Sequence, residues 1–142
     1  MRYDETTVQV RFNEVDAYQV VWHGHYVGWM EIGRTALAQR FGLDPFQLSQ
    51  LGYQGPVVSL ELKFLRPARF NDLITIRTTL EPSEAATLVF LSEVLGMDGN
   101  CLATGRTVHA LTGTDGVLQF RLPPAIAPLV GALQDWCSGE EP

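Results

Sequence analysis

The sequence predicts an α+β fold in which a curled antiparallel β-sheet wraps lengthwise around one long helix. Residues 24–41 carry apolar side chains at helical spacing, and most of the chain after Pro56 alternates between apolar and polar residues, as strands do. The expected helix is about 27 Å long at about 1.5 Å per residue. The strand expected over residues 56–64 has a similar length, at about 3.3 Å per residue. Helices do not separate the later strands, so an alternating β-α-β fold is excluded.

The first part of the chain is expected to form a strand, a loop and the long helix. Val8, Val10 and Phe12 share one face of a strand over residues 6–12, and the poor periodicity of residues 13–23 indicates a loop. The helix that follows is apolar over much of its circumference, so we expect it to be buried on most sides. Its apolar residues are Tyr26, Trp29, Met30, Ile32, Gly33, Ala36 and Leu37.

The rest of the chain is expected to hold a short helix, five strands and a final helix. Asp44 caps the short helix, in which Pro45 takes its favoured first position. The expected bounds are 45–51 for the short helix, 56–64, 73–80, 87–97, 101–112 and 117–120 for the strands, and 124–136 for the last helix. In the strand over 56–64 the residues of the apolar face are Val58, Leu60, Leu62 and Phe64.

Composition and charge narrow the class of protein. The 142 residues are 46% hydrophobic and fit one domain over residues 1–142. The formal net charge is −6 and Lys63 is the only lysine, which excludes a surface for nucleic acid. A ligand that carries several phosphates would have to be held locally, against the overall field of the protein.

Features of export and membrane insertion are absent from the sequence. Residues 1–5 precede no apolar segment of the signal-peptide kind, and no run reaches the roughly 18 apolar residues of a membrane helix. Cys101 and Cys137 match no metal or redox spacing, and a disulfide between them is not favoured. We therefore expect a cytoplasmic protein that does not bind membranes.

A family resemblance appears in the loop and the start of the long helix. Residues 10–26 read Val-Arg-Phe-Asn-Glu-Val-Asp-Ala-Tyr-Gln-Val-Val-Trp-His-Gly-His-Tyr. This segment resembles the signature of the 4-hydroxybenzoyl-CoA thioesterase branch of the hotdog-fold proteins. Further similar stretches follow in the same order, so that the resemblance covers about residues 6–124. Gln19 departs from it, since several relatives carry glycine or another small or apolar residue there. The other stretches are Glu31-Ile-Gly-Arg34, Pro56–Val58, Phe64–Asp72, Cys101–Thr107 and Leu122–Pro123.

The resemblance implies a hotdog-fold thioesterase that hydrolyses acyl-CoA. It makes Asp16 the catalytic carboxylate, either as the nucleophile or as a base that activates water. It also makes the backbone N–H of His23 the donor to the carbonyl oxygen at the positive end of the helix, and Gly24 beside it is expected to let the substrate approach the backbone closely. Composition alone favours a structural role for Asp16, in which it bonds nearby backbone amides. Glu14, the other carboxylate of this loop, is expected to be solvated.

Other residues are candidates for binding the substrate. Tyr18, Trp22 and Tyr26 either line an acyl pocket or pack in the core. Arg66, Arg69 and Arg106 are candidates for the phosphates of coenzyme A, because arginine binds phosphate in a bidentate way. The resemblance also implies a homodimer or a dimer of dimers, in which Ser59 comes from the partner chain.

Several alternatives stay open at this point. His23 and His25 suggest a metal pair, but imidazoles at this spacing diverge, so we expect no metal. We also expect no cofactor, since coenzyme A is part of the substrate. Glu31 and Arg34 are expected to form a structural ion pair. The competing functions are an acyl carrier protein thioesterase, a hotdog hydratase or dehydratase, and a module that binds acyl-CoA without cleaving it.

Overall fold

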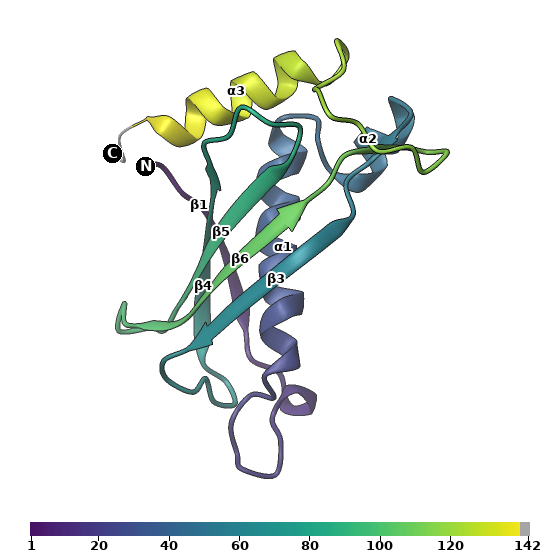
Figure 1. Cartoon of the computed structure of the whole chain (residues 1–142). Coiled ribbons are helices and arrows are strands. Elements are labelled where there is room, and N and C mark those ends of the chain that lie inside the picture. Colours follow the sequence, from purple (N-terminus) through teal and green to yellow (C-terminus); the bar gives the residue numbers. More distant parts are fainter. Residues whose placement is uncertain (140–142) are drawn as a thin grey trace.

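The structure of the chain is a computed structural model, and it describes residues 1–139. A long helix follows the first strand, and all the other strands of residues 1–139 come after it (Figure 1). The elements in chain order are β1 (Asp4–Gln9), the 3-10 helix η1 (Phe12–Glu14), α1 (Gly24–Arg40), α2 (Pro45–Gln50), β2 (Tyr53–Gln54), β3 (Val57–Phe64), β4 (Leu73–Glu81), β5 (Leu88–Leu95), β6 (Cys101–His109), β7 (Thr112–Gly113) and α3 (Ala127–Ser138).

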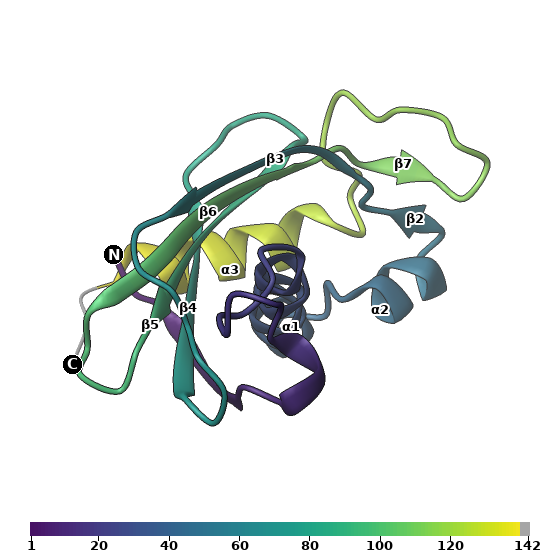
Figure 2. The ribbon, with the colours of Figure 1, turned by 90° about the horizontal axis from the view of Figure 1, so that it is seen from below.

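Five strands form one antiparallel sheet in the order β1-β4-β5-β6-β3. The sheet curls around α1, which lies in its concave face (Figure 2). Strands β2 and β7 pair separately as a small two-stranded sheet. The predicted α+β arrangement, with a helix wrapped by an antiparallel sheet, is therefore confirmed.

Two glycines bring α1 close to the sheet. A Cβ atom at Gly33 would lie 2.7 Å from Cγ2 of Ile76 in β4, and one at Gly105 in β6 would overlap the end of the Met30 side chain. Met30 and Ile76 are both fully buried. The absence of these two side chains therefore lets helix and sheet meet with native packing density.

The helix α1 is buried on one side only, so the expectation of burial on most sides was wrong. Trp29, Met30 and Leu37 face the sheet and are buried. On the other side, 47% of Ile32 is exposed and Val27 is exposed as well. The sheet of one chain curves around only part of the helix, which the helical spacing alone did not reveal.

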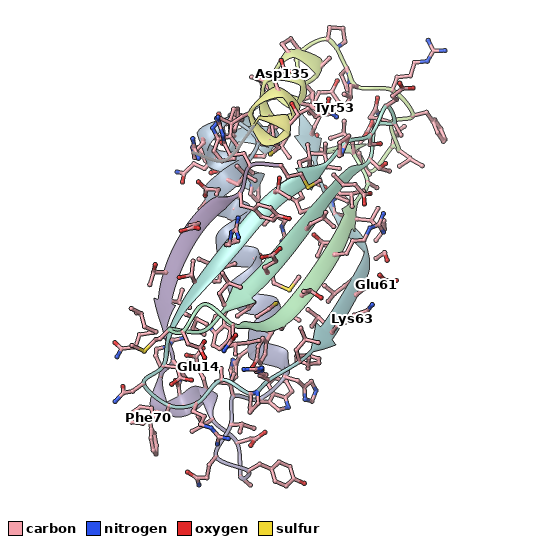
Figure 3. All side chains as sticks on the ribbon, turned by 90° about the vertical axis from the view of Figure 1, so that its left-hand side faces the viewer. Glu14, Tyr53, Glu61, Lys63, Phe70 and Asp135 are labelled. Carbon is pink, nitrogen blue, oxygen red and sulfur yellow. The ribbon has the colours of Figure 1, made fainter. Side chains whose placement is uncertain are left out.

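The C-terminal helix α3 closes one end of this core. Ile126, Val130 and Leu133 are buried against residues of α1, β4 and β5. Cys137 joins the same cluster, and both cysteines are free thiols. In Figure 3, Tyr53 and Asp135 lie at this end of the molecule, and Glu14 and Phe70 lie at the opposite end.

Some predicted element boundaries were wrong. The first strand ends at Gln9 instead of Phe12, because the chain turns into η1 there. The strand expected over residues 117–120 is absent from residues 1–139, apart from a single bridge between Thr112 and Leu118. The short strands β2 and β7 were missed, because two residues are too few for an alternating pattern.

Among the strands of residues 1–139, β3 lies at an edge of the sheet and pairs only with β6. Its apolar residues are largely uncovered, with exposed fractions of 61% for Val58, 42% for Leu60 and 49% for Phe64. An apolar edge of this length is a template for pairing with another strand. This edge of the sheet is therefore left uncovered by the described part of the chain.

Candidate active site

The loop before α1 folds back on itself as a small hairpin. Val15 and Val21 form an antiparallel bridge, and the N–H of Asp16 donates to the carbonyl of Val20 at 2.9 Å. The N–H of Gln19 donates to the carbonyl of Asp16 at 3.0 Å, and Gln19 has a φ of 67°. A turn followed by one left-handed residue is a common hairpin connection, and that residue is usually glycine. A glycine at this position would adopt the same φ without strain.

The carboxylate of Asp16 takes part in this turn with one of its oxygens. Its Oδ1 accepts a hydrogen bond of 2.8 Å from the N–H of Tyr18. This is the structural contact that composition alone favoured. The other oxygen, Oδ2, accepts no hydrogen bond within residues 1–139. Asp16 is only half-buried, so this second oxygen remains available to a ligand.

Glu14 is buried rather than solvated, which corrects the sequence-based expectation. Only 4% of the residue is exposed. Its Oε1 accepts from the N–H of Arg11 at 2.8 Å, and its Oε2 accepts from Nε1 of Trp29 at 3.2 Å. His25 approaches the same carboxylate, with Nδ1 at 4.0 Å from Oε2. Glu14 thus ties η1 to the first turns of α1, and the i, i+3 spacing of Arg11 and Glu14 was the only sign of this in the sequence.

The start of α1 carries backbone N–H groups without partners. His23 is the N-cap residue and makes no side-chain cap. The N–H groups of His25 and Tyr26 donate to the carbonyls of Trp22 and His23, whereas those of His23 and Gly24 donate to nothing within residues 1–139. Free donors at a helix N-terminus carry a partial positive charge. Such a group can stabilise an oxygen that becomes negative.

The indole of Trp22 lies against this helix start. Its ring centroid is 5.0 Å from that of His23 and 5.5 Å from that of His25. A Cβ atom at Gly24 would overlap the Trp22 ring, so the open space expected beside Gly24 is filled by indole in this structure. Trp22 is itself 48% exposed. Gly24 is therefore required by the packing of its neighbour.

A surface depression of about 260 Å³ lies beside the helix start. Three of the predicted site residues line it together, namely His23, Tyr26 and Arg66. The phenol oxygen of Tyr26 accepts from the N–H of Ala68 at 3.1 Å. Burial raises the pKa of Tyr26, with a further rise from the charge of Asp72, so the phenol stays protonated. The remaining residues of the depression are Val20, Val21, Phe64, Leu65 and Pro67.

The other predicted residues lie in different surroundings. Tyr18 is 86% exposed at the tip of the hairpin, and Arg69 is exposed in the loop before β4. Ser59 is exposed on the edge strand β3. Arg106 forms an ion pair of 3.0 Å with Glu81 and does not line the depression.

The expected ion pair between Glu31 and Arg34 is not formed. Burial lowers the pKa of Arg34, and the charge of Glu31 partly offsets this, so the two groups do interact electrostatically. Nevertheless no nitrogen–oxygen contact within 4.0 Å joins them in the described part of the chain. Arg34 instead lines a cavity at the other half of α1.

No group of three or more histidine, cysteine, aspartate or glutamate side chains in residues 1–139 is arranged to hold a metal ion. None of the helices in that range is long and apolar enough to cross a bilayer.

A family model described as the thioesterase superfamily matches residues 18–103, which include His23, Gly24 and the whole of α1. The chain belongs to the thioesterase superfamily. Asp16 lies just outside the matched residues.

Individual relatives of this thioesterase agree with the family match. The chain is 30% identical to a putative esterase from Synechocystis over 127 residues, which are 88% of this chain and 76% of the relative. It is 24% identical to a putative acyl-CoA thioesterase from Bacillus subtilis over 85% of this chain and 89% of the relative. The crystal structure of a DHNA-CoA thioesterase from Staphylococcus aureus superposes with a TM-score of 0.85 at 22% identity, covering 95% of this chain and 93% of the other. The fold is therefore the hotdog fold of these thioesterases, as the resemblance implied.

Proposed function

We propose that this thioesterase hydrolyses acyl-CoA to a free acid and coenzyme A. The Bacillus subtilis relative, which is named a putative acyl-CoA thioesterase, supports the choice of substrate. The observation that carries the proposal is the pair of free N–H groups at His23 and Gly24, at the end of a loop that also presents the free Oδ2 of Asp16. A thioester carbonyl needs these two partners, a donor for its oxygen and a group that acts on its carbon.

In the proposed reaction the carbonyl oxygen accepts from the N–H groups of His23 and Gly24. Oδ2 of Asp16 either attacks the carbonyl carbon or takes a proton from a water that attacks it. The tetrahedral species then collapses, the carbon–sulfur bond breaks and coenzyme A leaves as a thiolate. Where water attacks, this gives the free acid directly. Where Asp16 attacks, it leaves an anhydride between the acyl group and Asp16, which water then hydrolyses to the free acid and the aspartate. Thiols have pKa values near about 8.5, so this leaving group needs no strong acid. The reaction as written uses no cofactor other than the coenzyme A of the substrate.

We assign the coenzyme A phosphates to Arg66 and Arg69, which are exposed in the loop that packs against the hairpin. The hydrogen bond of 2.8 Å from the N–H of Val21 to the carbonyl of Ala68 joins these two loops. Arg106 already has the carboxylate of Glu81 as its partner, so it is the weaker candidate. We assign the acyl group to the depression beside Tyr26, whose apolar walls include Val21 and Phe64.

We further propose that the active unit is a homodimer that pairs through β3. Val58, Leu60 and Phe64 supply an exposed apolar edge, which a second copy in antiparallel pairing would cover. Ser59 on the same strand would then face the site of the partner. The free thiols of Cys101 and Cys137 favour a reducing compartment, and we keep the cytoplasm as the proposed location.

The test of the proposed function is thiol release from a panel of acyl-CoA esters by wild type and by Asp16→Asn. Asparagine keeps the Oδ1 acceptor for Tyr18 but cannot act as nucleophile or base, so we expect turnover to fall by about 10²–10⁴ while the substrate still binds. The matched control is Asp115→Asn, because Oδ1 of Asp115 accepts from the N–H of Val117 at 3.0 Å in the same kind of turn. Unchanged turnover in Asp16→Asn would remove Asp16 from the mechanism.

Two further arms separate the competing functions. Hydration of crotonyl-CoA by the wild type, without release of thiol, would identify a hydratase instead. Binding of acyl-CoA without any turnover, equal in wild type and Asp16→Asn, would identify a binding module. Much faster cleavage of acyl groups on acyl carrier protein than on coenzyme A would identify the carrier protein as the substrate.

A further inference from the structure

A second cavity, of about 320 Å³, lies at the other half of α1. It is bounded by α1, by α2 and by β5, and it includes no residue of the depression beside His23. Gly24 and Arg34 are separated by about 15 Å along the helix at about 1.5 Å per residue. Its volume is at the lower end of those that hold small organic ligands.

The walls of this cavity are largely apolar, and Thr35, Ser49 and Gln54 are its uncharged polar residues. Ala38, Leu43 and Leu48 form the side of α1 and α2, and Leu88 and Phe90 form the side of β5. Leu43, Leu48 and Phe90 are buried. A ligand that fills the cavity must therefore bury an apolar body.

Arg34 is the one cation on the cavity wall that is always charged, and its guanidinium is not paired with another group of the described chain. Burial lowers its pKa, and Glu31 is the only group that opposes this effect. No carboxylate is among the residues that line the cavity, and Arg34 makes no hydrogen bond or ion pair within residues 1–139. Taking an arginine out of water without a partner is unfavourable, so the site favours an anion.

The second titratable group of the cavity, His109, is already satisfied. Its Nδ1–H donates to the carbonyl of Gly55 at 3.0 Å, and its Nε2 lies 3.2 Å from Oγ1 of Thr107. Its ring packs edge-on against Phe90, with centroids 5.4 Å apart. Burial lowers the pKa of His109, so the ring is neutral and does not compete with Arg34 for an anion.

We propose that this cavity binds an apolar carboxylic acid, with the carboxylate on Arg34 and the apolar body between Leu48 and Phe90. Guanidinium and carboxylate match as a bidentate pair, which is strongest in a site shielded from water. The ligand class follows from the cavity alone. Its source rests on the proposed function: either the free acid released by hydrolysis, or an acyl group that carries a carboxylate at its far end.

The test is calorimetric binding of octanoate and of octanol to wild type, Arg34→Gln, Arg34→Lys and Arg121→Gln. Arg121 is an exposed arginine outside the cavity, so Arg121→Gln is the matched control. We expect wild type and Arg121→Gln to bind octanoate with an affinity about ten-fold or more higher than that of Arg34→Gln. The affinity of Arg34→Lys should lie between these values. Octanol should bind all four proteins alike. No octanoate binding to the wild type, or equal binding to Arg34→Gln in a folded state verified by circular dichroism, overturns the proposal.

A kinetic comparison of dodecanedioyl-CoA with dodecanoyl-CoA identifies the source of the ligand, because an extended chain of twelve carbons is about as long as the distance of about 15 Å between Gly24 and Arg34. If the carboxylate belongs to the acyl group, the wild type prefers dodecanedioyl-CoA in kcat/KM and Arg34→Gln loses that preference. If it belongs to the free acid, octanoate binds as above and the two esters are cleaved alike by both proteins. The calorimetry needs no turnover, so it tests whether the cavity binds a carboxylic acid even if the protein hydrolyses no thioester. Failure of the cavity proposal can therefore be told apart from failure of the proposed function.

Discussion

The buried carboxylate of Glu14 is predicted to hold the loop before α1 to that helix through Trp29. In Glu14→Gln the side-chain oxygen can accept from only one of the two donors, the N–H of Arg11 or Nε1–H of Trp29, and the amide NH₂ faces the other. A hydrogen bond to a charged group contributes about 1.5–3 kcal/mol, and a buried donor without a partner costs about 1–3 kcal/mol. Release of a buried charge offsets part of this, so we expect a net loss of about 2 kcal/mol in the free energy of unfolding.

A double-mutant cycle with Trp29→Phe isolates this contact. Phenylalanine removes the indole N–H, so once it is present Glu14→Gln no longer leaves that donor unpaired. We therefore expect a coupling free energy of about 1 kcal/mol or more between the two substitutions. The assay is urea unfolding followed by far-UV circular dichroism, which does not depend on the fluorescence of Trp29.

The control for this cycle is Glu31→Gln, because Glu31 is an exposed glutamate on α1, the helix that carries Trp29. Its effect should stay within about 0.5 kcal/mol. Coupling below about 0.3 kcal/mol between Glu14 and Trp29 would refute the reasoning, since independent sites add within that margin.

Three further predictions concern the loop, the helix–sheet contact and the buried histidine. Gln19→Gly should raise the free energy of unfolding by about 0.5 kcal/mol in thermal unfolding, because glycine relieves the left-handed φ of 67°. The control Ala17→Gly, at a residue whose φ is not positive, should lower that free energy. A loss of stability in Gln19→Gly would contradict this reasoning. Gly105→Ala should lower the free energy of unfolding by about 1–2 kcal/mol, since its Cβ meets the end of Met30, and equal stability in urea would show that Met30 moves aside freely. Burial lowers the pKa of His109, so the unfolded chain binds a proton more readily than the folded one. Stability should then fall as the pH drops below about 6.5, by at most about 1.4 kcal/mol per pH unit, and His109→Gln should flatten that slope in urea titrations at several pH values.

Local patterns of the sequence were enough to predict the main elements and the family. The helical spacing of residues 24–41 and the alternation in β3 and β4 correspond to the structure within one or two residues. They succeed because each depends on which face of one element is apolar, and that information is local. The signature of residues 10–26 likewise pointed to the thioesterases, because its residues are contiguous in the chain and need no knowledge of distant contacts.

Long-range contacts decided what the patterns left open. Glu14 was expected in solvent, yet it is buried because Trp29, fifteen residues away, meets it across the turn of η1. The surroundings of Glu14 are thus fixed only when the loop before α1 docks on the helix.

The sequence by itself determined an α+β thioesterase with a long helix against an antiparallel sheet, because periodicity and a contiguous motif are properties of the chain. Only the tertiary structure decided which side of α1 is covered by the sheet. It also decided that β3 lies at the edge of the sheet with its apolar side chains exposed. It alone also brought Arg34 into a cavity that no carboxylate of residues 1–139 lines. Burial and electrostatic pairing depend on segments that are distant in sequence, and the curl of the sheet sets which of them meet.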